Sequence, residues 1–432
     1  MREAGKAWDK ILARFAPLFT SASLAIFLRT SSAWVLVPGR RTITGVYQVA
    51  EPFNERAHDA YHRFFRQGAW SMRELWRSEA LMLVDAYAPD GRITLYMDDT
   101  LFHKSGRRIM GVAWWRDAVR STGSETVKSL GLNLLVQAIR VDPPWGGEPL
   151  ALPVGMRLHK KGGASLLELA RELLGEVSSW FPNREFDLCA DGFFAPLAGS
   201  LPEGVHLTSR IRKDAALYTL PPERKKGQRG RPRKKGDRLP SLEEIAGGAE
   251  EEDWQAVEVN ERGKMRQRLI LCFEALWYHV CGEKPVLVVI SRDPEGIERD
   301  DYFYTTDLAS SPEDVVDRYA GRWSIEDTFR NTKQSLGGEE PQSWKGHGPE
   351  RAAGFSFFIY SVVWDWYVST QGSRITWKHK PWYPKKVTPS FADALASLRQ
   401  VLWRRELITN SDPPSLMPEI ADMLIEILSR AA

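Results

Sequence analysis

The sequence predicts an α/β protein in which a mixed sheet is flanked by helices, follows a helical domain and contains a β-rich insertion. Three observations support this prediction. Apolar residues recur at three- and four-residue spacing up to about residue 88, strand-like runs begin at Arg92, and helical and strand-like segments alternate from residue 164. Strands that are joined through helices pair in parallel, so the sheet should contain parallel members.

Residues 1–88 are predicted to form the helical N-terminal domain, and we expect this domain to bind DNA. Its helical segments include "AWDKILARFAPLF", "NERAHDAYHRFFRQ" and "SMRELWRSEALMLVDAYA". Between the first two, "VPGRRTITGVYQVA" has a Pro-Gly break before a short helix that is rich in Arg and Thr. This arrangement is typical of a helix-turn-helix-like module, but a plain helical bundle with a basic loop explains it about equally well.

Residues 89–213 are predicted to hold the first part of the sheet. The runs "RITLYMDDT", "IMGVAWW" and "LGLNLLVQAIRV" have the composition of strands, and "EPLALPVGMRLHK" should pair with them. An amphipathic helix at 164–181 precedes the strand in "EFDLCADGFFAP", which a short helix connects to "VHLTSRIR". The result is a meander of strands followed by helical crossovers.

The rest of the chain is predicted to fall into three parts. Residues 214–305 form the β-rich insertion with a basic arm, and residues 306–375 complete the core with one long helix that starts after Ser311. The apolar run at 355–368 is too short to span a bilayer and is interpreted as a buried helix of this second core part. Residues 376–432 should be a C-terminal helical region with two helices.

The charge of the chain is distributed unevenly. The net charge is only +3, yet residues 224–238 hold nine basic residues and one acid, and residues 242–253 hold six acids and no base. A polyanion is attracted by the local concentration of basic residues rather than by the net charge of the chain, so this segment is predicted to bind DNA. Its Arg-Gly-Arg-Pro resembles the core of an AT-hook, although a solvated basic loop that contacts phosphate non-specifically fits better. The residues predicted to bind are Arg229, Arg231, Arg233, Lys234 and Lys235.

The sequence also indicates a cellular compartment. Its three cysteines form no CxxC pair and no even disulfide framework, which favours a reducing cytoplasm. The first residues mix both charges and lack the basic-then-apolar order of a signal peptide. We therefore expect a cytoplasmic protein.

Three carboxylates are candidates for catalysis. Asp99 and Asp191 each close an apolar strand, at the edge where a sheet presents side chains to a ligand. On a single continuous helix, Glu326 would share one stripe with Tyr319, Arg322, Arg330 and Lys333. Three such carboxylates are suitable ligands for hard divalent ions, and the cations around Glu326 are suitable for binding a phosphate group near those ions.

Each acid also has a structural interpretation. Asp98, Asp99 and Asp191 could belong to ordinary turns, and Glu326 could pair with an arginine four residues away. Strand alternation places Asp98 and Asp99 on opposite faces without deciding between them. Taken singly each acid favours the structural interpretation, and taken together they favour catalysis.

With these residues the chain resembles the bacterial insertion-sequence transposases of the DDE superfamily, which have an RNase H-like core. The branch with a Y-(2)-R-(3)-E-(6)-K signature is matched in full by Tyr319, Arg322, Glu326 and Lys333. The motifs "YMDDTLFHKSG" and "LCADGFF" correspond to the two aspartates and identify Asp99, rather than Asp98, as the first. The resemblance covers roughly residues 15–400.

The resemblance implies a function. Asp99, Asp191 and Glu326 would bind two Mg²⁺ ions, with Mn²⁺ able to substitute, and Tyr319, Arg322 and Lys333 would contact phosphates at the transposon end, with Arg330 as a helper. The expected activity is cut-and-paste transposition of an insertion sequence on double-stranded DNA, often through a DNA hairpin. A homodimer would act on terminal inverted repeats and target DNA in a bacterial cytoplasm, associated with the nucleoid when DNA is bound. Two alternatives are a transposase-derived DNA-binding protein without cleavage activity and an RNase H-like nuclease.

Overall fold

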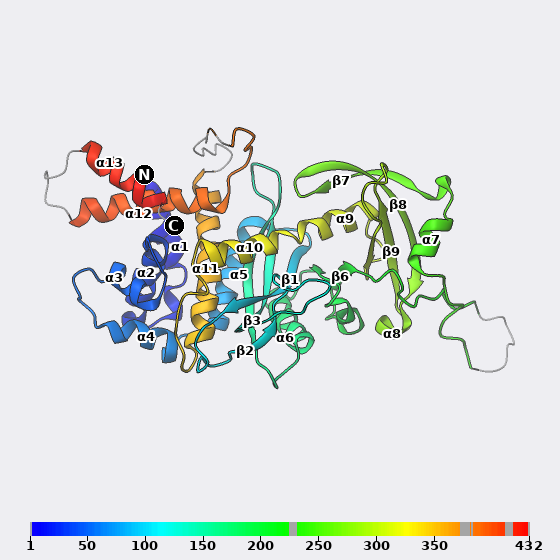
Figure 1. Cartoon of the computed structure of the whole chain (residues 1–432), viewed down its shortest axis with the longest axis horizontal. Coiled ribbons are helices and arrows are strands. Elements are labelled where there is room, and N and C mark those ends of the chain that lie inside the picture. The colour runs from blue at the N-terminus through cyan, green and yellow to red at the C-terminus, as the bar shows by residue number, and fades with distance from the viewer. Residues whose placement is uncertain (1, 224–230, 372–380, 382, 411–417, 431–432) are drawn as a thin grey trace.

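The computed structural model describes residues 2–223, 231–371, 381, 383–410 and 418–430. Figure 1 shows an elongated molecule with the N-terminal and C-terminal helices at one end and the core sheet at the centre. The strands of the insertion lie at the other end. None of the helices in these described ranges is both long and apolar enough to cross a membrane.

The N-terminal helices pack around one long apolar helix from the second half of the chain. They are α1 (Arg2–Ala13), α2 (Ser21–Leu36), α3 (Ile43–Ala50), α4 (His58–Gln67) and α5 (Met72–Tyr87). Helix α11 (Gly348–Gln371) is buried from Gly348 to Val368, which matches the predicted buried helix. Aromatic rings form the contact, with Phe15 4.9 Å from Phe358 and Trp34 5.4 Å from Phe355 between centroids. One hydrophobic core therefore joins the two ends of the sequence.

The basic loop before α3 is partly internal. Arg41 is buried, and its Nε donates to the Trp34 carbonyl at 3.1 Å. Thr42 caps α3 by accepting from the Gly45 amide at 3.0 Å, as expected for a Thr at this position. The helix-turn-helix-like role of this segment stays a prediction.

The core sheet has the predicted mixture of pairings. Its strands are β1 (Ile93–His103), β2 (Ala113–Arg116), β3 (Lys128–Val141), β4 (Leu150–His159), β5 (Phe186–Ala190) and β6 (Val205–Arg210). β3 pairs antiparallel with β1, β2 and β4, whereas β5 pairs in parallel with β1 and β6. The crossovers run through α6 (Leu166–Ser179) and the 3₁₀ helix Ala195–Ser200. The fold class is thus the predicted α/β class, with a mixed sheet flanked by helices.

The insertion extends the same sheet. β7 (Gln255–Glu261), β8 (Lys264–Leu276), β9 (Pro285–Arg292) and β10 (Asp301–Thr305) are all antiparallel, and β10 pairs with β6 of the core. Two short helices, α7 (Leu242–Gly248) and α8 (Tyr278–Cys281), accompany these strands. The ten strands therefore form one continuous sheet. The domain boundaries stay a prediction.

The helix that carries the signature is divided, so the prediction of a single long helix is wrong. α9 (Pro312–Gly321) and α10 (Ser324–Gln334) are joined by a tight turn at Arg322 and Trp323. The Arg322 amide bonds to the Tyr319 carbonyl at 3.1 Å, which is the i→i−3 pattern of a 3₁₀ turn. Gly321 lies against Tyr96, because a Cβ at this glycine would be 2.4 Å from the tyrosine Oη. The tighter winding alters the angles on which the predicted stripe was based.

The C-terminal region contains the two predicted helices, α12 (Phe391–Asn410) and α13 (Pro418–Arg430).

Candidate active site

Three aspartates lie where the parallel pairing of β1 with β5 ends, although β1 itself continues to His103 beside β3. β1 pairs with β5 from Ile93 to Met97, and the last pair of the register is Met97 with Ala190. Asp98 and Asp191 directly follow these two residues, and Asp99 comes next. The carboxyl ends of neighbouring parallel strands form an edge where α/β proteins bind ligands. The negative charge of Asp191 accordingly raises the pKa of both Asp98 and Asp99.

Asp98 is held by an arginine from the signature. Nη1 of Arg322 lies 2.7 Å from Oδ2 of Asp98, and both side chains are largely buried. Burial is the main cause that raises the pKa of Asp98 to about 7, with the neighbouring acids adding to it and Arg322 opposing it. Asp98 and Arg322 therefore form an internal ion pair at the edge of the site.

Asp99 has a neutral partner instead. Nδ2 of Asn133, on β3, donates to Oδ2 of Asp99 at 2.6 Å, and Oδ1 of Asn133 lies 3.0 Å from Nδ1 of His159 on β4. Burial raises the pKa of the Asp99 carboxyl, and the bond from Asn133 opposes that rise. Because an amide partner does not neutralise the charge, the charge of Asp99 is left available to a cation.

Sequence reasoning missed Asn133 and His159. Asn133 interrupts the apolar run "LGLNLLVQAIRV", and a buried amide in such a run needs a partner. That interruption was a usable indication of a polar site on the sheet. His159 stacks near Trp115, with 4.6 Å between ring centroids, and burial lowers the pKa of its imidazole.

Glu326 approaches the aspartates through Arg322. Nη2 of Arg322 lies 3.5 Å from Oε1 of Glu326, while Nη1 of the same guanidinium binds Asp98. Burial raises the pKa of Glu326, and the charges of Arg322 and Arg262 oppose the rise. Nε of Arg322 is buried and has no hydrogen-bond partner within the part of the chain that the structure describes. One arginine thus bridges an acid of the sheet and the acid of α10.

The other signature residues lie on two sides of this bridge. The Tyr319 ring is 4.8 Å from that of Phe303, and the guanidinium carbons of Arg210 and Arg322 lie 5.6 and 5.4 Å from its centre. Burial lowers the pKa of the Lys333 ammonium group, and the negative charge of Asp99 is one of those that oppose this shift. Arg330 is exposed and pairs with Asp327 at 2.8 Å.

The donor set fits a hard divalent ion, but the acids are not arranged around one point. Carboxylate oxygens are the ligands that Mg²⁺ prefers. Across the described ranges, no group of three or more His, Cys, Asp or Glu side chains lies close enough to hold a metal ion. The positive charge between Asp98 and Glu326 is that of Arg322. Closing Asp99, Asp191 and Glu326 around metal would require side-chain movement.

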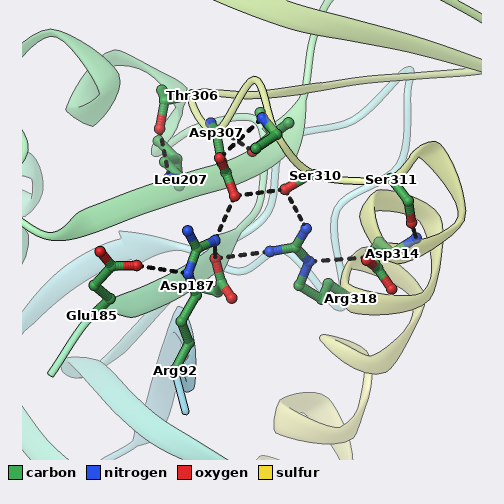
Figure 2. A network of polar contacts seen from close by, with 12 residues as sticks. Arg92, Glu185, Asp187, Leu207, Thr306, Asp307, Ser310, Ser311, Asp314 and Arg318 are labelled. Atoms are coloured by element: carbon green, nitrogen blue, oxygen red, sulfur yellow. Dashed lines mark hydrogen bonds and ion pairs between the residues drawn. The ribbon is translucent and has the colours of Figure 1, made fainter.

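A network of ion pairs, most of whose members are buried, joins α9 to the amino-terminal ends of β1 and β5 (Figure 2). Asp187 on β5 accepts from Arg318 of α9 at 2.8 Å and lies 3.4 Å from Arg92, which precedes β1. Arg92 also pairs with Asp307, and the Ser310 hydroxyl donates to Asp307 at 2.9 Å. Arg318 in turn donates to the Ser310 hydroxyl at 2.6 Å. The network joins β1, β5 and the start of α9, so it sets the position of the signature residues.

The basic segment lies apart from this site. Its described residues contact the insertion, whereas α10 lies near the centre of the molecule in Figure 1. Nζ of Lys235 lies 3.5 Å from the centre of the Tyr218 ring, Arg233 pairs with Asp237 at 3.3 Å, and Lys234 pairs with Glu283. Arg231 is exposed, and Arg229 lies outside the described residues.

Comparisons with known proteins give one family. The model of a family described as DDE superfamily endonuclease matches residues 14–268, which is more than half of the chain. The matched range contains Asp99 and Asp191 and ends before the helix that carries Glu326. No curated protein matches the chain.

Among solved structures, the chain is similar to piggyBac transposase in a synaptic complex with hairpin DNA, determined by cryo-electron microscopy. The TM-score is 0.38 and the identity is 11%, over 95% of this chain and 76% of that one.

Proposed function

The chain belongs to the DDE superfamily of endonucleases, and we propose that it is a DNA transposase that cleaves transposon ends and transfers the cut strand to target DNA. The observation that carries the proposal is that Asp98, Asp99 and Asp191 lie where the parallel pairing of β1 with β5 ends, with Glu326 linked to Asp98 through Arg322. Endonucleases of this superfamily generally use divalent metal ions.

Asp99, Asp191 and Glu326 are the proposed metal ligands. Two Mg²⁺ ions bound there would activate a water or a 3′-hydroxyl and stabilise the leaving oxygen of the phosphodiester. Asn133 orients the Asp99 carboxylate through its 2.6 Å hydrogen bond and leaves that carboxylate charged. Asp98 holds Arg322 at the edge of the site, so that the guanidinium faces the DNA phosphates.

Tyr319 and Lys333 of the signature, with Arg330 as a helper, would bind the DNA. Tyr319 presents a phenol beside the guanidinium groups of Arg210 and Arg322, which together suit a phosphate. Lys333 contributes a second cation on the Asp99 side of the site. Arg330 would have to leave its exposed pair with Asp327 to bind DNA, which costs little at the surface.

Double-stranded DNA is the proposed partner, in the form of terminal inverted repeats and a target site. We propose cut-and-paste transposition of an insertion sequence by a homodimer, in the bacterial cytoplasm. The basic residues Arg231, Arg233, Lys234 and Lys235 would hold DNA away from the reacting phosphate, because this segment contacts Tyr218 and Glu283 of the insertion.

A second candidate function is DNA binding without cleavage. The observation in its favour is that the bridge between Asp98 and Glu326 is an arginine, with no preformed metal cluster in the described part of the chain. Arginine in that position neutralises the acids without supplying a Lewis acid.

One experiment separates the two functions. The purified wild-type protein is incubated with Mg²⁺ and a DNA that carries the repeats flanking its gene. The variants Asp191→Ala and Glu326→Ala are assayed in parallel under the same conditions. Asp327→Ala is the matched control, since it removes a neighbouring acid of the same helix that pairs with Arg330. Cleavage by wild type and Asp327→Ala alone supports the transposase. Equal cleavage by all four proteins would refute the site, and binding without cleavage by wild type would favour the second function.

A further inference from the structure

The tip of the β7–β8 hairpin carries an arginine where a glycine or asparagine is normally found. Glu261 pairs with Lys264, so the turn consists of Arg262 and Gly263 alone. Their φ angles are +54° and +78°, the positive values that type I′ turns need. The Cβ of an arginine is sterically unfavourable in this left-handed region, and Asn-Gly is the pair that such a turn prefers. A bulky residue that is kept there points to a use for its side chain.

The tip is docked on the core. A Cβ added to Gly263 would lie 2.6 Å from the amide nitrogen of Glu148 and the carbonyl carbon of Gly147, in the loop between β3 and β4. That loop is anchored by Trp145, whose ring is 6.0 Å from that of Trp364. In Figure 1 the hairpin extends from the insertion back toward the centre of the molecule. The close backbone contact fixes where Arg262 stands.

Docking places Arg262 beside the candidate catalytic glutamate. Its guanidinium carbon lies 4.1 Å from the centre of the Trp323 ring, in the turn that joins α9 to α10. The positive charge of Arg262 opposes the rise in pKa that burial causes in Glu326 and Asp327. Arg262 is exposed and makes no ion pair with any residue that the structure describes. It is therefore a cation available to an external anion.

The space beneath the hairpin is also basic. A cavity of about 580 Å³ lies there, and the basic residues that line it outnumber the three acidic ones, Glu261, Glu298 and Asp301. The basic residues are Arg210, Arg262, Lys264, Arg266, Arg268 and Arg322. Its other arginines are occupied, since Arg266 pairs with Glu298, Arg268 with Glu261, and Arg210 with Asp301. Arg262 differs from them in having no carboxylate partner within the described chain.

We propose that Arg262 is a DNA-positioning residue, which the docked hairpin holds beside Glu326 to bind a backbone phosphate of the DNA. The inference deepens the proposed function and rests on it for the location of the DNA. It assigns the β7–β8 hairpin a role in completing the phosphate-binding surface, next to Arg322. The Arg262 guanidinium lies over the Trp323 ring, and its N–H donors point outward in the plane of the guanidinium, where they can bind a phosphate.

The test compares Arg262→Asn with Arg299→Asn. Asn favours the positive φ of the turn, so Arg262→Asn should unfold at a temperature no lower than wild type while binding DNA more weakly. Arg299→Asn removes the same charge from an exposed site of the same insertion. Binding to a short duplex is measured by fluorescence anisotropy in Ca²⁺ across a salt series. Loss of one phosphate contact should lower the slope of log K against log salt by about 0.9 in Arg262→Asn, and Arg299→Asn should keep the wild-type slope.

Gly263→Ala tests the docking. Its Cβ would collide with the Gly147 and Glu148 backbone and lift the tip, so binding should weaken although Arg262 is still present. An Arg262→Asn protein with the wild-type slope and affinity would overturn the inference, as would one that only loses thermal stability. If wild type binds DNA but does not cleave it in Mg²⁺, the proposed function fails, while the slopes still decide the role of Arg262.

Discussion

Replacing Asp307 with asparagine should destabilise the protein by about 1–2 kcal/mol at pH 7 and by roughly half as much at pH 3. The Asp307 side chain is 8% exposed, and it accepts from the Ser310 hydroxyl at 2.9 Å, from the Ala309 amide at 3.1 Å and from Arg92. Burial alone would raise its pKa, but these partners outweigh burial and lower the pKa to about 2, from an ordinary value of 3.8.

The size of the effect follows from this pKa. A carboxyl whose pKa is lowered in the folded state adds stability above its unfolded pKa, and the gain is lost as the pH falls through the folded pKa. The difference of nearly two units corresponds to roughly 2.4 kcal/mol at pH 7. Screening at the partly exposed Arg92 should reduce the measured value to about 1–2 kcal/mol. At pH 3 we expect roughly half of the neutral-pH value.

The assay is urea unfolding of wild type and Asp307→Asn, followed by tryptophan fluorescence at pH 7 and pH 3. Glu185→Gln is the control, because Glu185 pairs with the same arginine at 2.8 Å but is 56% exposed. Its loss should cost less than about 1 kcal/mol. A destabilisation by Asp307→Asn that is equal at both pH values would refute the reasoning, because the lowered pKa would then have no part in it.

Three further predictions concern the candidate site and the basic arm. Asn133→Ala removes the donor to Asp99, so the pKa of Asp99 should rise and the acid limb of the rate–pH profile should move to higher pH; an unmoved limb would exclude this positioning role. Asp99→Asn should abolish cleavage, while Asp98→Asn, which keeps an oxygen for Arg322, should retain more of it; the reverse order of rates would make Asp98 the first ligand. Replacing the four basic-arm residues Arg231, Arg233, Lys234 and Lys235 with neutral ones should weaken DNA binding and lower the slope of log affinity against log salt concentration by up to about 3.6. An unchanged slope would show that these residues do not contact DNA.

Much of the architecture was predictable because it depends on short-range patterns of apolar and polar residues. The apolar run that ends in Asp191 predicts the end of β5, which the structure confirms. The prediction that Asp99 closes its strand is wrong, because β1 continues to His103 through its pairing with β3, and only the parallel pairing with β5 ends before Asp98. The superfamily predicted from the signature and the aspartate motifs is confirmed by the family match. The roles of the individual acids stay predictions.

Other features depend on contacts between distant segments and could not be derived locally. The break after Gly321 coincides with a close approach to Tyr96 on β1, which lies far away in the sequence. The pairing register between β1, β3 and β4 brings Asn133 and His159 to Asp99. Sequence patterns show where strands occur but leave their register open.

The central claim is that Asp99, Asp191 and Glu326 bind the divalent ions that cleave DNA. The most direct test is the single-turnover cleavage rate of wild type and Glu326→Gln on DNA with the terminal repeats, measured across a Mg²⁺ series. Loss of a metal ligand should remove several kcal/mol of transition-state stabilisation, so the account predicts a rate at least about a hundredfold lower at saturating Mg²⁺. Equal rates and equal Mg²⁺ dependence in the two proteins would contradict it.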